Sequence, residues 1–587
     1  MLPPPRGDRL AATLDSHDTP SITNFTVGIP DSVSRPGHEL HTNAARWRTK
    51  EFIFYAMMFV LVVPVMIWIP IRLSSPTNPN YPLYARRLSK GWLFGRPVDM
   101  SDRQYSSFRN NLFPLLLLSS VHCGCSFIQK QLAASPQARA RFIAIFSICM
   151  LVVLHGVSAL KILTILSLNF AAAKSPKSAI VTKTWPAVLF MVNMGVLFLN
   201  ERFDGYKLGE LHAMFDPLDT LGGILPRWHI SFNITMLRII SFAMDYHWRN
   251  TKIAMDHRIR VKTPLPHDQY TFINFLAYSL YPPLYIAGPI MTFNDFMHQL
   301  RKPVAISTRE KVSYSIRFIF CLLTMESILH TMYVVAIKDS KAWEGDSPAE
   351  LSMIGVWNLL IVWLKLLIPW RFFRLWALLD GVDPPENMVR CMANNYSTLG
   401  FWKSWHRSYN LWVVRYLYIP LGGAKRRWLS TLVVFTFVAL WHDLSMKLLA
   451  WGWLVSLFIL PEILASFLLP ASKFGDAWWY RHLCASGGVV NMLLMTSANL
   501  VGFVLGLDGM RYFLYQLTSS WAGRYHTPVA LSRARLPSSP PPYNSESWLT
   551  KAGLTFMLFA CLCLFVAVQV MFEYREEEHR QGLDRKC

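Results

Sequence analysis

The chain has 587 residues, of which 52% are hydrophobic and only 16% are charged. A typical soluble domain has about 25% charged residues, so this composition excludes an ordinary soluble enzyme and predicts a multi-pass membrane protein. The formal net charge of +22 does not indicate nucleic-acid binding, because the basic residues gather in short loops. Lys and Arg in such loops set membrane topology and contact anionic lipid headgroups.

In chain order, residues 1–45 are rich in Pro, Ser, Asp and Arg and predict a disordered polar tail. We then expect an all-α fold with about 11 or 12 membrane segments, since each crossing needs about 20 apolar residues. The shorter or more polar segments are predicted to be re-entrant or buried against neighbouring helices. The expected segments lie near residues 52–72, 112–128, 142–168, 185–200, 229–246, 269–292, 313–336, 352–378, 429–444, 448–470, 487–507 and 552–574.

Polar stretches interrupt this pattern. Residues 75–111 contain several aromatic residues and predict a structured loop, whereas residues 524–548 are rich in Pro and Ser and predict a low-complexity linker before the last span. Residues 576–587 predict a polar C-terminal tail.

The most informative pair of residues is Trp441-His442, which ends the apolar run 429–440. Ionisable groups in such runs are costly, and they are usually functional. A lone histidine there would more often be a core residue with satisfied hydrogen bonds. A second histidine, His406, lies on the preceding segment, so we predict a two-histidine site.

A neutral imidazole can take a proton from an alcohol or amine, which is general-base catalysis. A buried site also excludes water, so that an activated acyl group is transferred and not hydrolysed. The pair therefore suggests acyl transfer between a thioester and a hydroxyl. Proton relay in a pump uses the same residue types. The spacing of the two histidines alone does not distinguish the pump from the acyltransferase.

The run 401–423, which contains His406, and the stretch Ala439-Leu-Trp-His442-Asp together resemble the membrane-bound O-acyltransferase superfamily. Within it the chain is similar to the fungal glycerol uptake protein branch, which is related to hedgehog acyltransferase. The resemblance covers residues 46–575 as one membrane domain. Supporting stretches lie at 232–245, 285–296 and 374–388.

The resemblance implies a helical fold enclosing a tunnel, with acyl-CoA entering from the cytosolic side and the acceptor from the lumenal side. His442 matches the superfamily's catalytic histidine, and His406 occupies the second catalytic position, which is Asn, His or Asp in different members. For the fungal branch the implied reaction is O-acylation of the lyso-lipid of glycosylphosphatidylinositol (GPI) anchors. The implied location is the endoplasmic reticulum membrane, with the plasma membrane as a second location. Acyl-CoA is a co-substrate, and no bound cofactor or metal is expected.

The helix between the histidines should break at Pro420 and Gly422, so that the chain turns back and both imidazoles meet in one cavity. We expect the basic residues of this turn and of a second polar segment to bind acyl-CoA, and three further residues to bind a substrate. The former are Lys425, Arg426, Arg427 and Arg374, and the latter are Asn410, Trp405 and Asp380. The alternatives are a solvated, helix-capping loop for Arg374 and Asp380 and an aromatic belt for the tryptophan.

A second function class is a glycerol or polyol transporter, with proton coupling as one form. Transporters commonly show inverted repeats with broken helices in matching halves. The sequence has no such internal symmetry, which favours the acyltransferase.

Overall fold

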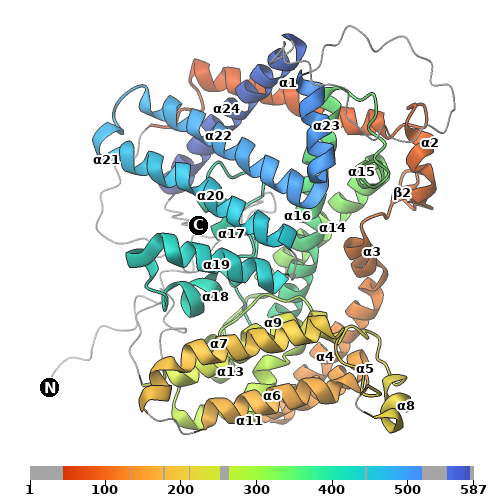
Figure 1. Ribbon diagram of the computed structural model, residues 1–587, viewed down its shortest axis with the longest axis vertical. Helices are drawn as coiled ribbons and strands as arrows, with labels where there is room; N and C mark the ends of the chain where they lie inside the picture. Colours follow the sequence, from red (N-terminus) through yellow and green to blue (C-terminus); the bar gives the residue numbers. More distant parts are fainter. Residues whose placement is uncertain are drawn as a thin grey trace.

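The computed structural model of the chain consists of helices and one short hairpin (Figure 1). It describes residues 44–133, 135–175, 179–210, 212–250, 264–442, 446–518 and 551–581. Among these residues, eight helices are long and apolar enough to cross a membrane. They confirm the predicted all-α, multi-pass membrane fold. They belong to α1 (Lys50–Leu73), α4 (Leu112–Leu132), α5 (Pro136–His155), α14 (Thr308–Thr331), α16 (Pro348–Leu379), α20 (Met446–Leu468), α22 (Tyr480–Asn499) and α24 (Lys551–Arg580).

The predicted segment 142–168 was wrong as a single span. Gly156 ends α5 with a φ of 56°, a left-handed conformation that favours glycine, and α6 (Ser158–Lys174) then begins in a new direction. A Cβ atom at this position would lie 2.0 Å from the carbonyl oxygen of Leu221, so the close approach of two backbones also requires glycine.

The predicted segment 269–292 is a set of short pieces and not a spanning helix. Helix α11 (Phe272–Ser279) ends before Pro282 and Pro283, which begin the one-turn helix α12 (Pro282–Tyr285). Both pieces are buried, as expected for irregular backbone at membrane depth.

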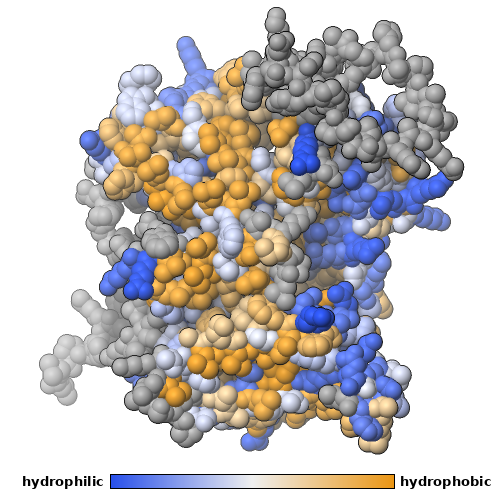
Figure 2. All heavy atoms as spheres, viewed as in Figure 1, coloured by the Kyte–Doolittle hydropathy of each residue, from blue (hydrophilic) through white to orange (hydrophobic). Residues whose placement is uncertain are grey.

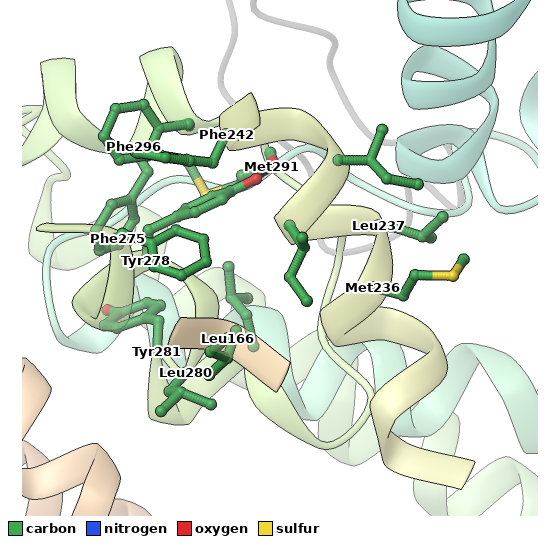
Figure 3. Close-up of a cluster of buried hydrophobic side chains, with 14 of the residues drawn as sticks. Leu166, Met236, Leu237, Phe242, Phe275, Tyr278, Leu280, Tyr281, Met291 and Phe296 are labelled. Atoms are coloured by element: carbon green, nitrogen blue, oxygen red, sulfur yellow. Dashed lines mark hydrogen bonds between the residues drawn. The ribbon is translucent and has the colours of Figure 1, made fainter. Parts of the chain in front are cut away.

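Helix α9 (Trp228–His247) forms the centre of one half of the molecule. Most of its residues are buried, because α6, α7 (Ala179–Arg202), α11 and α13 (Phe293–Arg301) pack around it. Figure 3 shows Phe242 of α9 among Phe275, Tyr278 and Phe296 from the neighbouring helices. The Phe242 and Phe275 rings lie 4.6 Å apart between centroids. Close packing of this aromatic cluster fixes α9, which in turn supports the candidate site.

The other half contains α1, α16, α20, α22 and α24, with α24 packed against α1 and α22. Figure 2 shows hydrophobic side chains over much of the face formed by α20 and α22. Exposed apolar residues on these helices include Leu457, Phe467 and Val490, which suits a surface in contact with lipid.

The structured loop predicted at 75–111 contains strands β1 (Leu88–Ser89) and β2 (Val98–Asp99) and helix α3 (Arg103–Asn110). The buried carboxylate of Glu326 on α14 anchors it, because this group accepts hydrogen bonds from Trp92, Tyr105 and Arg109 at 2.8–2.9 Å. The predicted linker 524–548 and nearly all of the tail 1–45 lie outside the described residues. Helix α24 continues to Arg580, through the first part of the segment predicted as a polar tail.

Candidate functional site

His406 lies between two short helices, α17 (Thr398–Ser404) and α18 (Arg407–Val413). The start of α17 is held by Glu462 of α20, which accepts hydrogen bonds from the Ser397 hydroxyl and, at 3.2 Å, from the backbone N–H of Leu399. His406 itself has a φ of 47° and a ψ of 50°. This left-handed conformation is uncommon for a residue with a side chain, and such residues cluster at functional sites.

Aromatic rings hold the His406 imidazole in place. The Trp370 ring of α16 stacks on it with centroids 4.6 Å apart and an interplanar angle of 14°. The Tyr409 ring lies 5.3 Å away at 20°. These contacts orient the imidazole by packing, in surroundings that are mostly apolar.

The chain turns between the two histidines, as predicted. Helix α18 runs into a π-helical segment, η4 (Val414–Tyr418), and the turn that follows contains Gly422 with a φ of 109°. The short helix η5 (Gly423–Arg426) then leads into α19 (Arg427–His442), which carries the second histidine as its last residue. π-Helical segments are rare and frequently occur at functional sites.

The end of α19 is fixed by Trp441. Its indole N–H donates a hydrogen bond to the backbone carbonyl of Asn233 on α9, at 3.1 Å, and its ring stacks on Tyr409 with centroids 4.5 Å apart. The π-helical segment is anchored to the other end of α9, where Arg415 Nη2 lies 3.0 Å from Asp245 Oδ1. Contacts with the buried helix α9 therefore hold both ends of the chain segment that joins the two histidines.

Tyr409 is the residue that both histidines share. Its ring centre lies 5.3 Å from that of His406 and 6.3 Å from that of His442. The Tyr409 hydroxyl is buried and has no hydrogen-bond partner among the described residues. This hydroxyl is therefore not used to hold the described part of the fold together.

His442 is not fully covered by the protein. More than a third of its surface is accessible to solvent, whereas its neighbour Trp441 is buried. Figure 1 shows α18 and α19 between the two halves of the molecule, so the helices next to the two histidines lie in this middle part of the fold.

The residues predicted to bind a substrate lie in different surroundings. Asn410 is on α18, where its backbone N–H donates to the His406 carbonyl at 3.0 Å. The Trp405 ring stacks on Phe401 at 5.3 Å and meets Trp370 edge to face at 6.4 Å. Both residues are therefore immediate neighbours of His406, and their contact with a substrate stays a prediction.

Asp380 is fully engaged with protein groups at the end of α16. Its carboxylate accepts hydrogen bonds from the Ser126 and Tyr281 hydroxyls, the latter at 2.5 Å, and lies 3.2 Å from Lys130 Nζ and 3.5 Å from Arg139 Nη2. A role for Asp380 in binding a substrate would require one of these interactions to be given up.

The residues predicted to bind acyl-CoA lie at two places. Lys425 and Arg426 are exposed at the start of α19, whereas the side chain of Arg427 lies outside the described part of the chain. Arg374 is buried and pairs with Asp383 at 2.7 Å and with Glu386 at 3.4 Å. The structure thus separates Arg374 from the basic residues of the turn, and acyl-CoA binding at either place stays a prediction.

Two residues at the site were not singled out from the sequence. Tyr409 lies three residues after His406, a spacing that puts both on one helical face, and this signal could have identified it. Trp370 precedes His406 by many residues, so only the fold reveals its contact.

Comparisons with known proteins show the family of the chain. The model of the membrane-bound O-acyltransferase family matches residues 189–507, which include both histidines. The chain is 44% identical to "Membrane-bound O-acyltransferase GUP1" of Saccharomyces cerevisiae, over 93% of this chain and 94% of that protein. It is 36% identical to "Membrane-bound O-acyltransferase gup1" of Schizosaccharomyces pombe, over 100% of this chain and 97% of that protein.

A more distant relative is "Protein-cysteine N-palmitoyltransferase HHAT" of Mus musculus, which is 30% identical over 32% of this chain and 40% of that protein. The family match, the extent of the similarity and the two-histidine site agree with one another. The chain therefore belongs to the membrane-bound O-acyltransferase family and is a multi-pass membrane acyltransferase.

Proposed function

We propose that this enzyme moves a long fatty acyl group from acyl-CoA to the hydroxyl of a membrane lipid, with His442 as the general base. The observation that carries the proposal is the approach of the His406 and His442 rings to the same Tyr409 ring, with His442 accessible to solvent. An imidazole in mostly apolar surroundings stays neutral and can accept a proton, as a general base must.

In the proposed reaction, His442 takes the proton of the acceptor hydroxyl while the hydroxyl oxygen attacks the thioester carbonyl. The carbon–sulfur bond then breaks, and the leaving CoA thiolate takes the proton back from His442, which returns the imidazole to its neutral form. The products are an ester and free CoA. His406 contacts the same Tyr409 ring, so it can hold the acceptor or the thioester in position.

The length of α19 supports the proposed orientation of acyl-CoA. This helix has 16 residues, so it is about 24 Å long, and Lys425 and Arg426 lie at the end opposite to His442. This separation is comparable to the length of the pantetheine arm that joins the CoA thioester to its phosphates. Basic residues at that end can therefore meet the phosphates while the thioester reaches the histidines.

The proposed acceptor is the lyso-lipid of a GPI anchor, and the proposed location is the endoplasmic reticulum membrane. Both come from the resemblance to the fungal branch. The name of the mouse relative, which specifies a palmitoyl group, supports a long acyl chain. The apolar surface of the molecule supports an acceptor that arrives from the bilayer.

Purified full-length protein in liposomes provides the test. With a long-chain acyl-CoA and a lyso-lipid acceptor, the wild type should release CoA and form the diacyl product. His442→Ala should abolish both while the protein still inserts into the membrane. His212→Ala, at an exposed histidine far along the chain, is the matched control and should keep the full rate.

The same liposomes address the transporter alternative. We expect glycerol flux to remain at background in the wild type. Saturable glycerol flux that survives His442→Ala, without any CoA release, would overturn the proposed function. Retained turnover in purified His442→Ala would overturn the assignment of the general base.

A further inference from the structure

Three buried arginines gather where α14 and α16 run side by side. They are Arg317 of α14 and Arg371 and Arg374 of α16, and each exposes less than a tenth of its surface. Arg371 and Arg374 are charged neighbours of Arg317. The acyl-transfer step proposed above does not use Arg317 or Arg371.

Arg374 is well compensated. Its guanidinium donates to Asp383 at 2.7 Å and to the Pro384 carbonyl at 2.9 Å, and it lies 3.4 Å from the Glu386 carboxylate. Glu386 also accepts a hydrogen bond from the buried Tyr314 hydroxyl at 2.8 Å.

Arg317 and Arg371 are not compensated to the same degree. Arg371 Nη1 donates to Cys321 Sγ at 2.9 Å, but its Nε has no hydrogen-bond partner among the described residues. Arg317 has two such nitrogens, Nε and Nη2. The cluster contains three positive charges and the two negative charges of Asp383 and Glu386, which leaves one positive charge in excess.

A buried charge without a partner is unfavourable, and arginine cannot lose its proton to avoid the cost. The end of α16 carries a partial negative charge of about half a unit, which offsets part of the excess. The free N–H groups remain, and a guanidinium fork matches the oxygens of a phosphate. The cluster therefore has the charge and the donors to bind an anion.

The cluster is next to the histidine site. Trp370, which stacks on His406, directly precedes Arg371 and lies one helical turn before Arg374. The segment after Glu386 also contacts the site, because the Asn387 carbonyl accepts a hydrogen bond from the backbone N–H of Arg407 at 3.0 Å. A molecule that reacts at the histidines could therefore place a charged group against these arginines.

We infer that Arg317, Arg371 and Arg374 form a binding site for a phosphate group of a substrate. The inference rests on the proposed function and deepens it, because it requires at least one substrate to carry phosphate close to the reacting groups. The phosphate belongs either to CoA or to the headgroup of a phospholipid acceptor, and the experiment separates the two sources.

The test compares full-length wild type with Arg317→Gln, using Arg317→Lys to retain the charge and Arg87→Gln as a control at an exposed arginine. Two donors are used, acyl-CoA and the phosphate-free thioester acyl-N-acetylcysteamine. Two acceptors are used, lysophosphatidylinositol and the phosphate-free monoacylglycerol. We expect Arg317→Gln to raise the KM of one phosphate-bearing substrate roughly 10- to 100-fold and to leave its phosphate-free counterpart unchanged.

An effect on acyl-CoA alone assigns the phosphate to CoA, and an effect on lysophosphatidylinositol alone assigns it to the acceptor. Arg317→Lys should recover part of the affinity, and Arg87→Gln should match the wild type. Equal KM values for all four substrates in Arg317→Gln and wild type would overturn the inference.

A second variant, Arg371→Gln, covers the case in which Arg317→Gln does not fold. It changes the other incompletely paired guanidinium of the cluster, so it should raise the KM of the same phosphate-bearing substrate and leave the phosphate-free counterpart unchanged. Binding of desulfo-CoA and of lysophosphatidylinositol to His442→Ala, measured without turnover, separates loss of the proposed reaction from loss of the phosphate site. Unchanged binding of both ligands when Arg371→Gln is added to His442→Ala would also overturn the inference.

Discussion

The buried ion pair between Asp245 and Arg415 offers a sharp test of how the two histidines are held together. Asp245 Oδ1 lies 3.0 Å from Arg415 Nη2 and accepts a hydrogen bond from the Tyr416 hydroxyl at 2.9 Å, while Oδ2 accepts one from the Asn294 backbone at 3.2 Å. Asp245→Asn keeps the shape and one acceptor oxygen but removes the charge.

The expected loss of stability is large, because the substitution leaves Arg415 buried without its counter-ion. Breaking a buried ion pair by removing one partner typically costs about 3–5 kcal/mol. Since Asn retains some of the hydrogen bonds, we expect the lower end, about 3 kcal/mol, which corresponds to more than a hundredfold in the folding equilibrium. The π-helical segment η4 would be loosened, so kcat should fall as well.

Two quantities are measured on the purified protein in detergent: the free energy of unfolding and the rate of CoA release. The matched variant is Asp245→Asn combined with Arg415→Met, which removes the stranded charge and should recover part of the lost stability. A loss of unfolding free energy below about 1 kcal/mol in Asp245→Asn would refute the argument. A double variant that loses more unfolding free energy than the two single variants together would also refute it.

Three further predictions concern the site and the loop before α16. His406→Ala should lose most of the acyl-transfer rate and His406→Asn less, since Asn can still form a hydrogen bond; full turnover in His406→Ala would exclude a direct role. Tyr409→Phe should lower kcat roughly 10- to 100-fold without lowering the thermal unfolding midpoint, because the hydroxyl has no hydrogen-bond partner among the described residues, and an unchanged kcat would rule out contact with the reacting groups. Burial raises the pKa of Asp346 to about 7, with the Glu350 carboxylate as a second cause, so the folded state holds a proton that the unfolded state has already lost. Stability should therefore fall as the pH rises from about 4 to about 7, and Asp346→Asn should raise the unfolding midpoint at pH 8 but not at pH 4; equal shifts at both pH values would contradict this reasoning.

The sequence alone was sufficient for the class of protein and for the two histidines. Long apolar runs predict membrane helices because the hydrocarbon core requires a fixed length of apolar residues. The break between His406 and His442 was also predictable, because Pro420 and Gly422 act on the backbone locally. These features depend on residues close together in the chain, which a linear pattern can reveal.

The tertiary structure decided what surrounds the histidines. Trp370 stacks on His406, and Asp245 pairs with Arg415, across separations in the chain that carry no local signal. The division of 142–168 at Gly156 likewise depends on the approach of a distant backbone carbonyl. Hydrophobic periodicity reports which residues are buried but not which ones meet, because partners are chosen by the packing of whole helices. For this reason the histidines were predictable from the sequence, whereas the aromatic rings, the ion pair and the arginine cluster around them emerged only from the fold.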